Sequence, residues 1–180
     1  FYNDDGSVGD VTVTGGSDSE IHVEIGVSAG NIGDVSFSIT GSGASGSVLE
    51  LSASAGSIGD ITIDVQDEAN IDLNVSANSS YDEDEVGTEG NIGNVSITLG
   101  YDTMFSGDIT ASGGDIGNVT VNVEGFEASG NLDLTANWVS GDTDADKSAD
   151  DYVRGGNIGD ITLNITGEDA NFDLNATASG

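Results

Sequence analysis

The residues best suited to chemistry in this sequence are carboxylates at regular spacing. Between residues 140 and 152, side chains that offer oxygen ligands occur at every second position: Asp142, Asp144, Asp146, Ser148 and Asp150. Calcium accepts six to eight oxygen ligands in flexible geometry, so this alternation predicts one weak calcium site. A solvated acidic loop that binds no ion is the alternative interpretation.

The alternating segment resembles the D-x-D-x-D calcium loop of EF-hand and dockerin proteins over about ten residues. It departs from that loop at two positions, since Lys147 replaces the turn glycine and Val153 replaces the final bidentate glutamate. Both changes weaken the expected site. The resemblance therefore implies a weak calcium loop and argues against a calcium sensor.

A second series of carboxylates belongs to a repeated motif. It comprises Asp10, Asp34 and Asp60, with Asn94, Asn118 and Asp160 at the same place in later copies. Stacked like charges repel unless they are screened or bridged, and calcium is the natural bridging ion. The alternative is that these side chains cap turns through hydrogen bonds to the backbone. A further stacked series is expected in the second strand of each repeat: His22, Glu50, Asp72, Asp108, Asp133 and Asp173.

The charge balance excludes several classes of function. The 180 residues include 33 Asp and Glu but only 2 Lys and Arg, which gives a formal net charge of −31, with no Cys and a single His. Nucleic-acid binding needs clustered cations, and thiol or multi-histidine metal chemistry needs residues that this sequence lacks. Apolar runs are too short to span a bilayer, so no membrane insertion is expected.

The motif G-x-[IV]-G-[DN]-[IV]-[ST] organises the chain. Its six copies start at Gly6, Gly30, Gly56, Gly90, Gly114 and Gly156, so the starts are separated by 24, 26, 34, 24 and 42 residues. Each copy opens a stretch in which apolar and polar residues alternate, as in 61–65, and a second alternating stretch follows, as in 71–75. Such alternation predicts two strands per repeat, each with one buried face.

We therefore predict an all-β chain, a β-solenoid of six rungs with two strands per rung and a repeat of about 24 residues. It is expected to be a single domain over residues 1–180, with rungs starting near 6, 30, 56, 90, 114 and 156 and loop insertions at 79–89 and 140–155. The predicted core contains Ile58, Ile61, Ile63, Val65 and their counterparts in the other rungs. The glycines of the motif are expected to supply positive φ or a bulge at the corner. Regular short strands are also typical of a β-sandwich, which is the alternative fold.

The outward positions that begin the first strand of each repeat carry only hydroxyl groups: Thr12, Ser36, Thr62, Ser96, Thr120 and Thr162. This array resembles those of ice-binding solenoids. Thr also favours exposed strand positions in general, so ice binding is the less favoured interpretation. Asn78, which begins an insertion within an N-x-[ST] sequence, is the candidate for N-glycosylation.

The acidic residues lie in regular columns rather than at one departure from the repeat, so the chain is not expected to be an enzyme. The whole chain resembles, in architecture, the secreted bacterial and archaeal β-solenoid surface proteins, including adhesin stalks. This resemblance implies an extracellular or cell-surface location.

Open solenoid ends are bare sheet edges, which polymerise unless they are blocked. The sequence accordingly predicts the structural subunit of an extracellular filament or surface stalk, a head-to-tail homopolymer whose acidic surface binds calcium or other cations. Its assembly ends would contain Phe1 and Tyr2 on one side and Phe172 and Leu174 on the other. The alternative is a calcium-dependent adhesin module that binds glycans or surfaces through the edge that carries the insertions.

Overall fold

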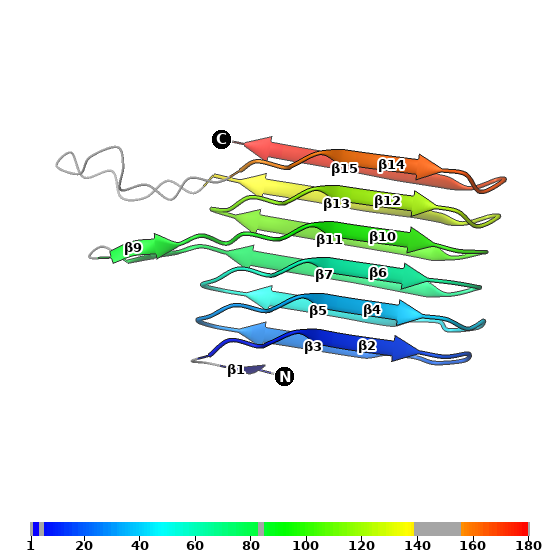
Figure 1. Cartoon of the computed structure of the whole chain (residues 1–180), viewed down its shortest axis with the longest axis horizontal. Coiled ribbons are helices and arrows are strands. Elements are labelled where there is room, and N and C mark those ends of the chain that lie inside the picture. The colour runs from blue at the N-terminus through cyan, green and yellow to red at the C-terminus, as the bar shows by residue number, and fades with distance from the viewer. Residues whose placement is uncertain (1, 4–5, 83–84, 139–155, 180) are drawn as a thin grey trace.

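The computed structural model describes residues 2–3, 6–82, 85–138 and 156–179, and this part of the chain confirms the predicted all-β class (Figure 1). One set of strands comprises β2 (Val11–Gly15), β4 (Val35–Ile39), β6 (Ile61–Val65), β10 (Val95–Leu99), β12 (Val119–Val123) and β14 (Ile161–Ile165). The other comprises β1 (Tyr2–Asn3), β3 (His22–Val27), β5 (Ser47–Ala53), β7 (Asn70–Asn78), β11 (Met104–Ser112), β13 (Ser129–Asn137) and β15 (Asn171–Ser179). Over the described residues, no helix is long and apolar enough to cross a membrane.

Each set forms one parallel sheet, and the chain alternates between the two sheets. The six-stranded sheet has the order β14-β12-β10-β6-β4-β2, and the seven-stranded sheet has the order β1-β3-β5-β7-β11-β13-β15. Pairing follows the sequence motif residue by residue, since Val35 pairs with Ile61 and Ile61 pairs with Val95. Equivalent positions of successive repeats therefore lie side by side, as Figure 1 shows.

A third contact joins the repeats at the third residue of the motif. Single-residue parallel bridges link Val8, Ile32, Ile58, Ile92, Ile116 and Ile158 in that order. The prediction of two strands per repeat is thus incomplete, because this bridge lies in the short link between the two sheets. A lone bridging residue between two glycines gives no alternating pattern from which a strand could be predicted.

One strand pair in the described residues is antiparallel. β8 (Ser80–Asp82) pairs with β9 (Glu85–Thr88) within the first predicted insertion, and the hydroxyl oxygens of Ser80 and Thr88 lie 2.9 Å apart. The β-sandwich alternative requires antiparallel hairpins within the main sheets, whereas the pairings there are parallel.

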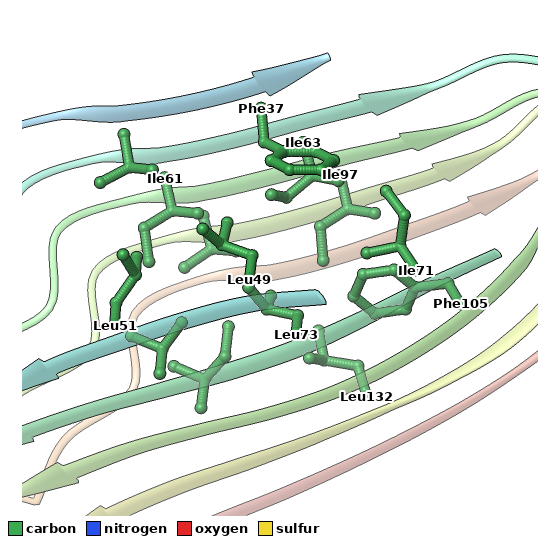
Figure 2. Close-up of a cluster of buried hydrophobic side chains, with 14 of the residues drawn as sticks. Phe37, Leu49, Leu51, Ile61, Ile63, Ile71, Leu73, Ile97, Phe105 and Leu132 are labelled. Atoms are coloured by element: carbon green, nitrogen blue, oxygen red, sulfur yellow. The ribbon is translucent and has the colours of Figure 1, made fainter. Parts of the chain in front are cut away.

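The hydrophobic core lies between the two sheets (Figure 2). The predicted core residues Ile58, Ile61, Ile63 and Val65 are all buried. Figure 2 shows Phe37, Ile63 and Ile97 of the six-stranded sheet facing Leu49 and Leu73 of the seven-stranded sheet. Near the carboxyl-terminal ends of the strands in the seven-stranded sheet, the inward positions of five strands are alanines that pair in register: Ala53, Ala77, Ala111, Ala136 and Ala178.

Two phenylalanine side chains fill the core beside two glycines of the seven-stranded sheet. Gly107 occupies an inward position that is apolar in neighbouring repeats, pairing with Leu73 and Leu132. A Cβ atom added at Gly107 would lie 2.7 Å from Cε1 of Phe105, and one added at Gly130 would lie 2.8 Å from Cε2 of Phe172. The two phenylalanine rings stack with centroids 6.1 Å apart. They occupy the volume that the glycines leave, so the core stays packed at these two positions.

Candidate functional site

The link between the sheets carries a ladder of side-chain to backbone hydrogen bonds, here named the Asp/Asn ladder. Its members are Asp10, Asp34, Asp60, Asn94, Asn118 and Asp160. The Oδ1 of each of the first five accepts a hydrogen bond from the backbone N–H of the next member, with distances of 3.1, 2.9, 2.7, 3.0 and 2.9 Å. The ladder satisfies backbone donors that the strands do not reach. These side chains do accept backbone hydrogen bonds, as the turn-capping alternative expected, but from the backbone of the next repeat rather than from their own turn.

A second ladder, the Ser/Asn ladder, runs three residues earlier in the motif. Its members are Ser7, Asn31, Ser57, Asn91, Asp115 and Asn157. A side-chain oxygen of each of the first five again accepts a hydrogen bond from the backbone N–H of the next member, at 3.0, 2.8, 3.1, 2.7 and 2.9 Å. These side chains therefore bind the backbone of the following repeat.

The second glycine of the motif allows the repeats to approach this closely. A Cβ atom at Gly117 would lie 2.9 Å from the carbonyl carbon and oxygen of Gly93 and 3.0 Å from the backbone nitrogen of Asn94. Positive φ is not the reason, since it occurs at the first motif glycine of two copies, Gly30 (133°) and Gly156 (105°), and at none of the second glycines in the described chain. Positive φ, one of the two roles expected for the motif glycines, is thus wrong for the second glycine, which allows close approach of the repeats.

Non-glycine residues with positive φ lie at the opposite corner, between the six-stranded and seven-stranded sheets. They are all acidic: Asp18, Asp67, Glu68, Asp102, Glu127 and Asp169. The sequence prediction missed these residues, although acidic residues in the turns after five of the six first strands, all except β4, were its available signal.

The predicted carboxylate series of the second strands is wrong in register. His22 pairs with Val48 and Asp72 lies in that column, whereas Glu50 pairs with Glu24 and Asn74 in the neighbouring outward column. Alternation alone cannot reveal a shift of two residues, because both registers keep the same face buried. This register brings His22, Glu24 and Glu50 together. Among the described residues they form a group that could hold a metal ion, because one ligand atom of each lies within 4.8 Å of the others.

The predicted calcium ligands divide into two groups. Asp142, Asp144, Asp146, Ser148 and Asp150 lie outside the described residues. Asp10, Asp34 and Asp60 lie on adjacent repeats, and one carboxylate oxygen of each accepts a backbone hydrogen bond in the Asp/Asn ladder. Calcium binding along this ladder stays a prediction, and only the second oxygen of each carboxylate is without a ladder hydrogen bond.

The repeat that contains β14 exposes the positions that are buried in β4, β6, β10 and β12. Ile161, Leu163 and Ile165 are 40%, 38% and 43% exposed, whereas their partners in β12, Val119, Val121 and Val123, are fully buried. In the described chain both ladders also end here, at Asn157 and Asp160. We call this surface the β14 face. It is apolar in its centre and carries the next hydrogen-bond acceptors of both ladders at its side.

The residues predicted to form assembly ends are only partly at this surface. Phe172 is 8% exposed and stacks on Phe105, and Leu174 is half-buried. Phe1 lies outside the described residues, and Tyr2 belongs to β1. The more exposed apolar side chains are those of β14, which the sequence prediction did not single out. Asn78, the glycosylation candidate, is the last residue of β7 and is half-buried, so it precedes the insertion that was expected to contain it.

Comparisons with protein families, with curated proteins and with solved structures find no match for this chain.

Replacing Asp60 tests the Asp/Asn ladder. Asp60→Ala removes the acceptor for the Asn94 N–H and is expected to lower the free energy of unfolding by about 1 kcal/mol. Asp60→Asn keeps an Oδ1 acceptor, so its effect should be clearly smaller. Urea unfolding in calcium-free buffer measures both variants, and equal losses would show that the ladder bond does not stabilise the fold. Repeating the series in CaCl2 tests the calcium prediction, because a calcium site at Asp60 requires wild type to gain more stability than Asp60→Asn.

Proposed function

We propose that the repeats are successive coils of a β-solenoid whose function is structural. In this proposal the chain is a subunit of an extracellular filament or surface stalk, assembled head to tail. The alternating parallel strands, paired at the spacing of the motif, support the solenoid interpretation. The β14 face is the observation that carries the assembly proposal, because three core positions are exposed there together.

The first repeat offers a surface of matching pattern. The inward residues of β2, Val11 and Val13, are only half-buried, and each belongs to the column that ends at Ile161 or Leu163. Stacking β2 of one copy on β14 of another would bury both apolar rows and pair two open strand edges. The contact is heterologous, so it generates an open filament rather than a closed ring.

The same stacking extends both ladders across the joint. Within the chain, the backbone N–H groups of Asn31 and Asp34 donate to the side chains of Ser7 and Asp10 in the preceding repeat. The backbone N–H groups of Ser7 and Asp10 are the equivalent donors of the first repeat. In an assembled filament they would donate to the side chains of Asn157 and Asp160 of the preceding copy. Each joint would then repeat the hydrogen bonds already present within the chain.

The net charge opposes assembly and gives cations a role. Bringing together copies that each carry a formal charge of −31 is unfavourable at low ionic strength. Calcium or other cations that bind the acidic surface would lower this repulsion. The insertions after β7 and β13 leave from strands of one sheet and are not needed for stacking. The described hairpin β8–β9 of the first insertion would project from the side of the filament, where the alternative adhesin function would also place its ligand-binding edge.

Electron microscopy with sedimentation tests this proposal directly. The purified chain, titrated with CaCl2 or with NaCl at matched ionic strength, is expected to form long unbranched filaments above a critical concentration. Calcium should lower that concentration more than NaCl does if specific sites contribute beyond screening. Dispersed single copies at millimolar calcium and high protein concentration would contradict the filament proposal.

A further inference from the structure

The short strand β1 lies on the edge of the seven-stranded sheet that head-to-tail stacking would use. Tyr2 pairs with Gly26 and Asn3 pairs with Val27, both in parallel. Among the described residues, β1 pairs with β3 at these two positions, which are the last two of β3. β1 therefore covers only the carboxyl-terminal end of the β3 edge.

The register shows which residues of another copy would need this position. Gly26 belongs to the column Ser52, Ser76, Thr110, Thr135 and Thr177, and Val27 belongs to the column Ala53, Ala77, Ala111, Ala136 and Ala178. If β3 stacks on β15 of a preceding copy in the register of the internal repeats, Gly26 must pair with Thr177 and Val27 with Ala178. These are the edge positions that Tyr2 and Asn3 occupy.

A strand edge accepts one partner at each position, because its N–H and C=O groups point to one side at a fixed spacing. β1 and the end of an incoming β15 therefore exclude each other. β1 offers two paired residues, whereas β15 uses all nine of its residues in pairing with β13. Exchange of β1 for β15 consequently replaces a short pairing by a longer one and favours the joint once β1 has left.

We propose that β1 is an autoinhibitory strand that must be displaced from β3 before a second copy can dock. This inference rests on the proposed head-to-tail assembly and adds a regulated step to it. Because β1 must first be displaced, it would slow the formation of each joint and raise the critical concentration. It would not prevent growth, since the incoming strand pairs with more of the β3 edge.

A reversible covalent lock tests the proposal. The sequence contains no cysteine, so the double variant Tyr2→Cys with Gly26→Cys, here called the lock variant, can form only the intended disulfide within one copy. Paired positions in a sheet are about 4.8 Å apart, within the range that a disulfide spans. Ser52 and Ser76 carry side chains in the same column as Gly26, which indicates that a side chain fits there.

The matched control is the double variant Ser52→Cys with Ser76→Cys. These residues are paired in the same column, and their hydroxyl oxygens lie 3.4 Å apart, but they lie away from β1. The oxidised lock variant is expected to form no filaments at ten times the wild-type critical concentration, and a reductant should restore assembly. The oxidised control should assemble like wild type in both conditions.

A variant lacking residues 1–5 provides the second measurement. Removal of β1 is expected to lower the critical concentration about tenfold, the equivalent of roughly one net hydrogen bond, and to shorten the lag before assembly. Circular dichroism checks that the lock variant and the deletion variant keep the wild-type fold. If the two cysteine substitutions themselves weaken assembly of the reduced lock variant, the deletion variant still tests whether β1 is inhibitory.

The outcomes separate this inference from the proposed function. If wild type assembles and neither the lock nor the deletion changes its critical concentration, β1 is not inhibitory and the filament proposal stands. The inference is also overturned if the folded deletion variant assembles less well than wild type. If wild type and the deletion variant both stay as single copies at millimolar calcium, the filament proposal itself fails.

Discussion

Leu163→Asp is expected to abolish filament formation while leaving the single chain folded. Leu163 is 38% exposed at the centre of the β14 face, although the equivalent Val121 is fully buried. A carboxylate there stays hydrated in the isolated chain, but docking of a second copy would bury it in an apolar interface without a partner. We expect the critical concentration to rise at least about a hundredfold.

The control for this variant is Thr162→Asp, which adds the same charge to the same strand. Thr162 is exposed on the outward column of the six-stranded sheet, beside Thr120, so its side chain would remain in water after docking. Sedimentation and microscopy should show filaments for Thr162→Asp and none for Leu163→Asp, with unchanged circular dichroism for both. Equal assembly by the two variants would show that the β14 face is not the joint.

Gly117→Ala and Gly9→Ala form the second pair, since the same substitution at the same motif position should have different effects. A Cβ atom at Gly117 would meet the backbone of Gly93 and Asn94, whereas one at Gly9 has nothing within 4 Å. Gly117→Ala should lower the free energy of unfolding by about 1–3 kcal/mol, because the repeats must move apart to admit the methyl group. Gly9→Ala should leave it nearly unchanged.

The two variants differ again in assembly. By the equivalence of the repeats, a methyl group at Gly9 would meet Gly159 and Asp160 of a preceding copy, as one at Gly33 would meet Gly9 and Asp10. Gly9→Ala is therefore expected to be as stable as wild type below the critical concentration and yet to assemble poorly. Urea unfolding of dilute protein and sedimentation of concentrated protein measure the two effects separately. Loss of stability in dilute Gly9→Ala would contradict this account of the motif glycine.

Much of the fold follows from local pattern. The alternation of Ile61, Ile63 and Val65 with polar residues predicts a strand with one buried face, and all three are buried. The repeated motif predicts that equivalent residues meet, as Thr62 and Ser96 do in the outward column. These features were predictable because strand periodicity acts over a few residues and because the motif itself recurs in the sequence.

Other features depend on contacts between repeats, which one sequence does not encode locally. The Asp/Asn ladder requires knowing that the Asn94 N–H faces Asp60 rather than a group in its own turn. The pairing of Glu50 with Glu24 depends on a register that burial alone does not select. The exposure of Leu163 became visible only from the three-dimensional stack, because its sequence context matches that of buried residues.

The constancy of register across unequal repeats has a practical consequence for protein engineering. Starts of the third and fourth motif copies are 34 residues apart and those of the fifth and sixth are 42 apart, yet Ile61 still pairs with Val95 and Val119 with Ile161. Relative to the 24-residue repeat, 10 (34 − 24) and 18 (42 − 24) additional residues are accommodated after β7 and β13. The corners that follow β5 and β11 are equivalent in the repeat, so foreign peptides grafted there should leave the sheets intact. A filament of such subunits would be a scaffold that carries grafted epitopes or enzymes at a spacing fixed by its own repeat.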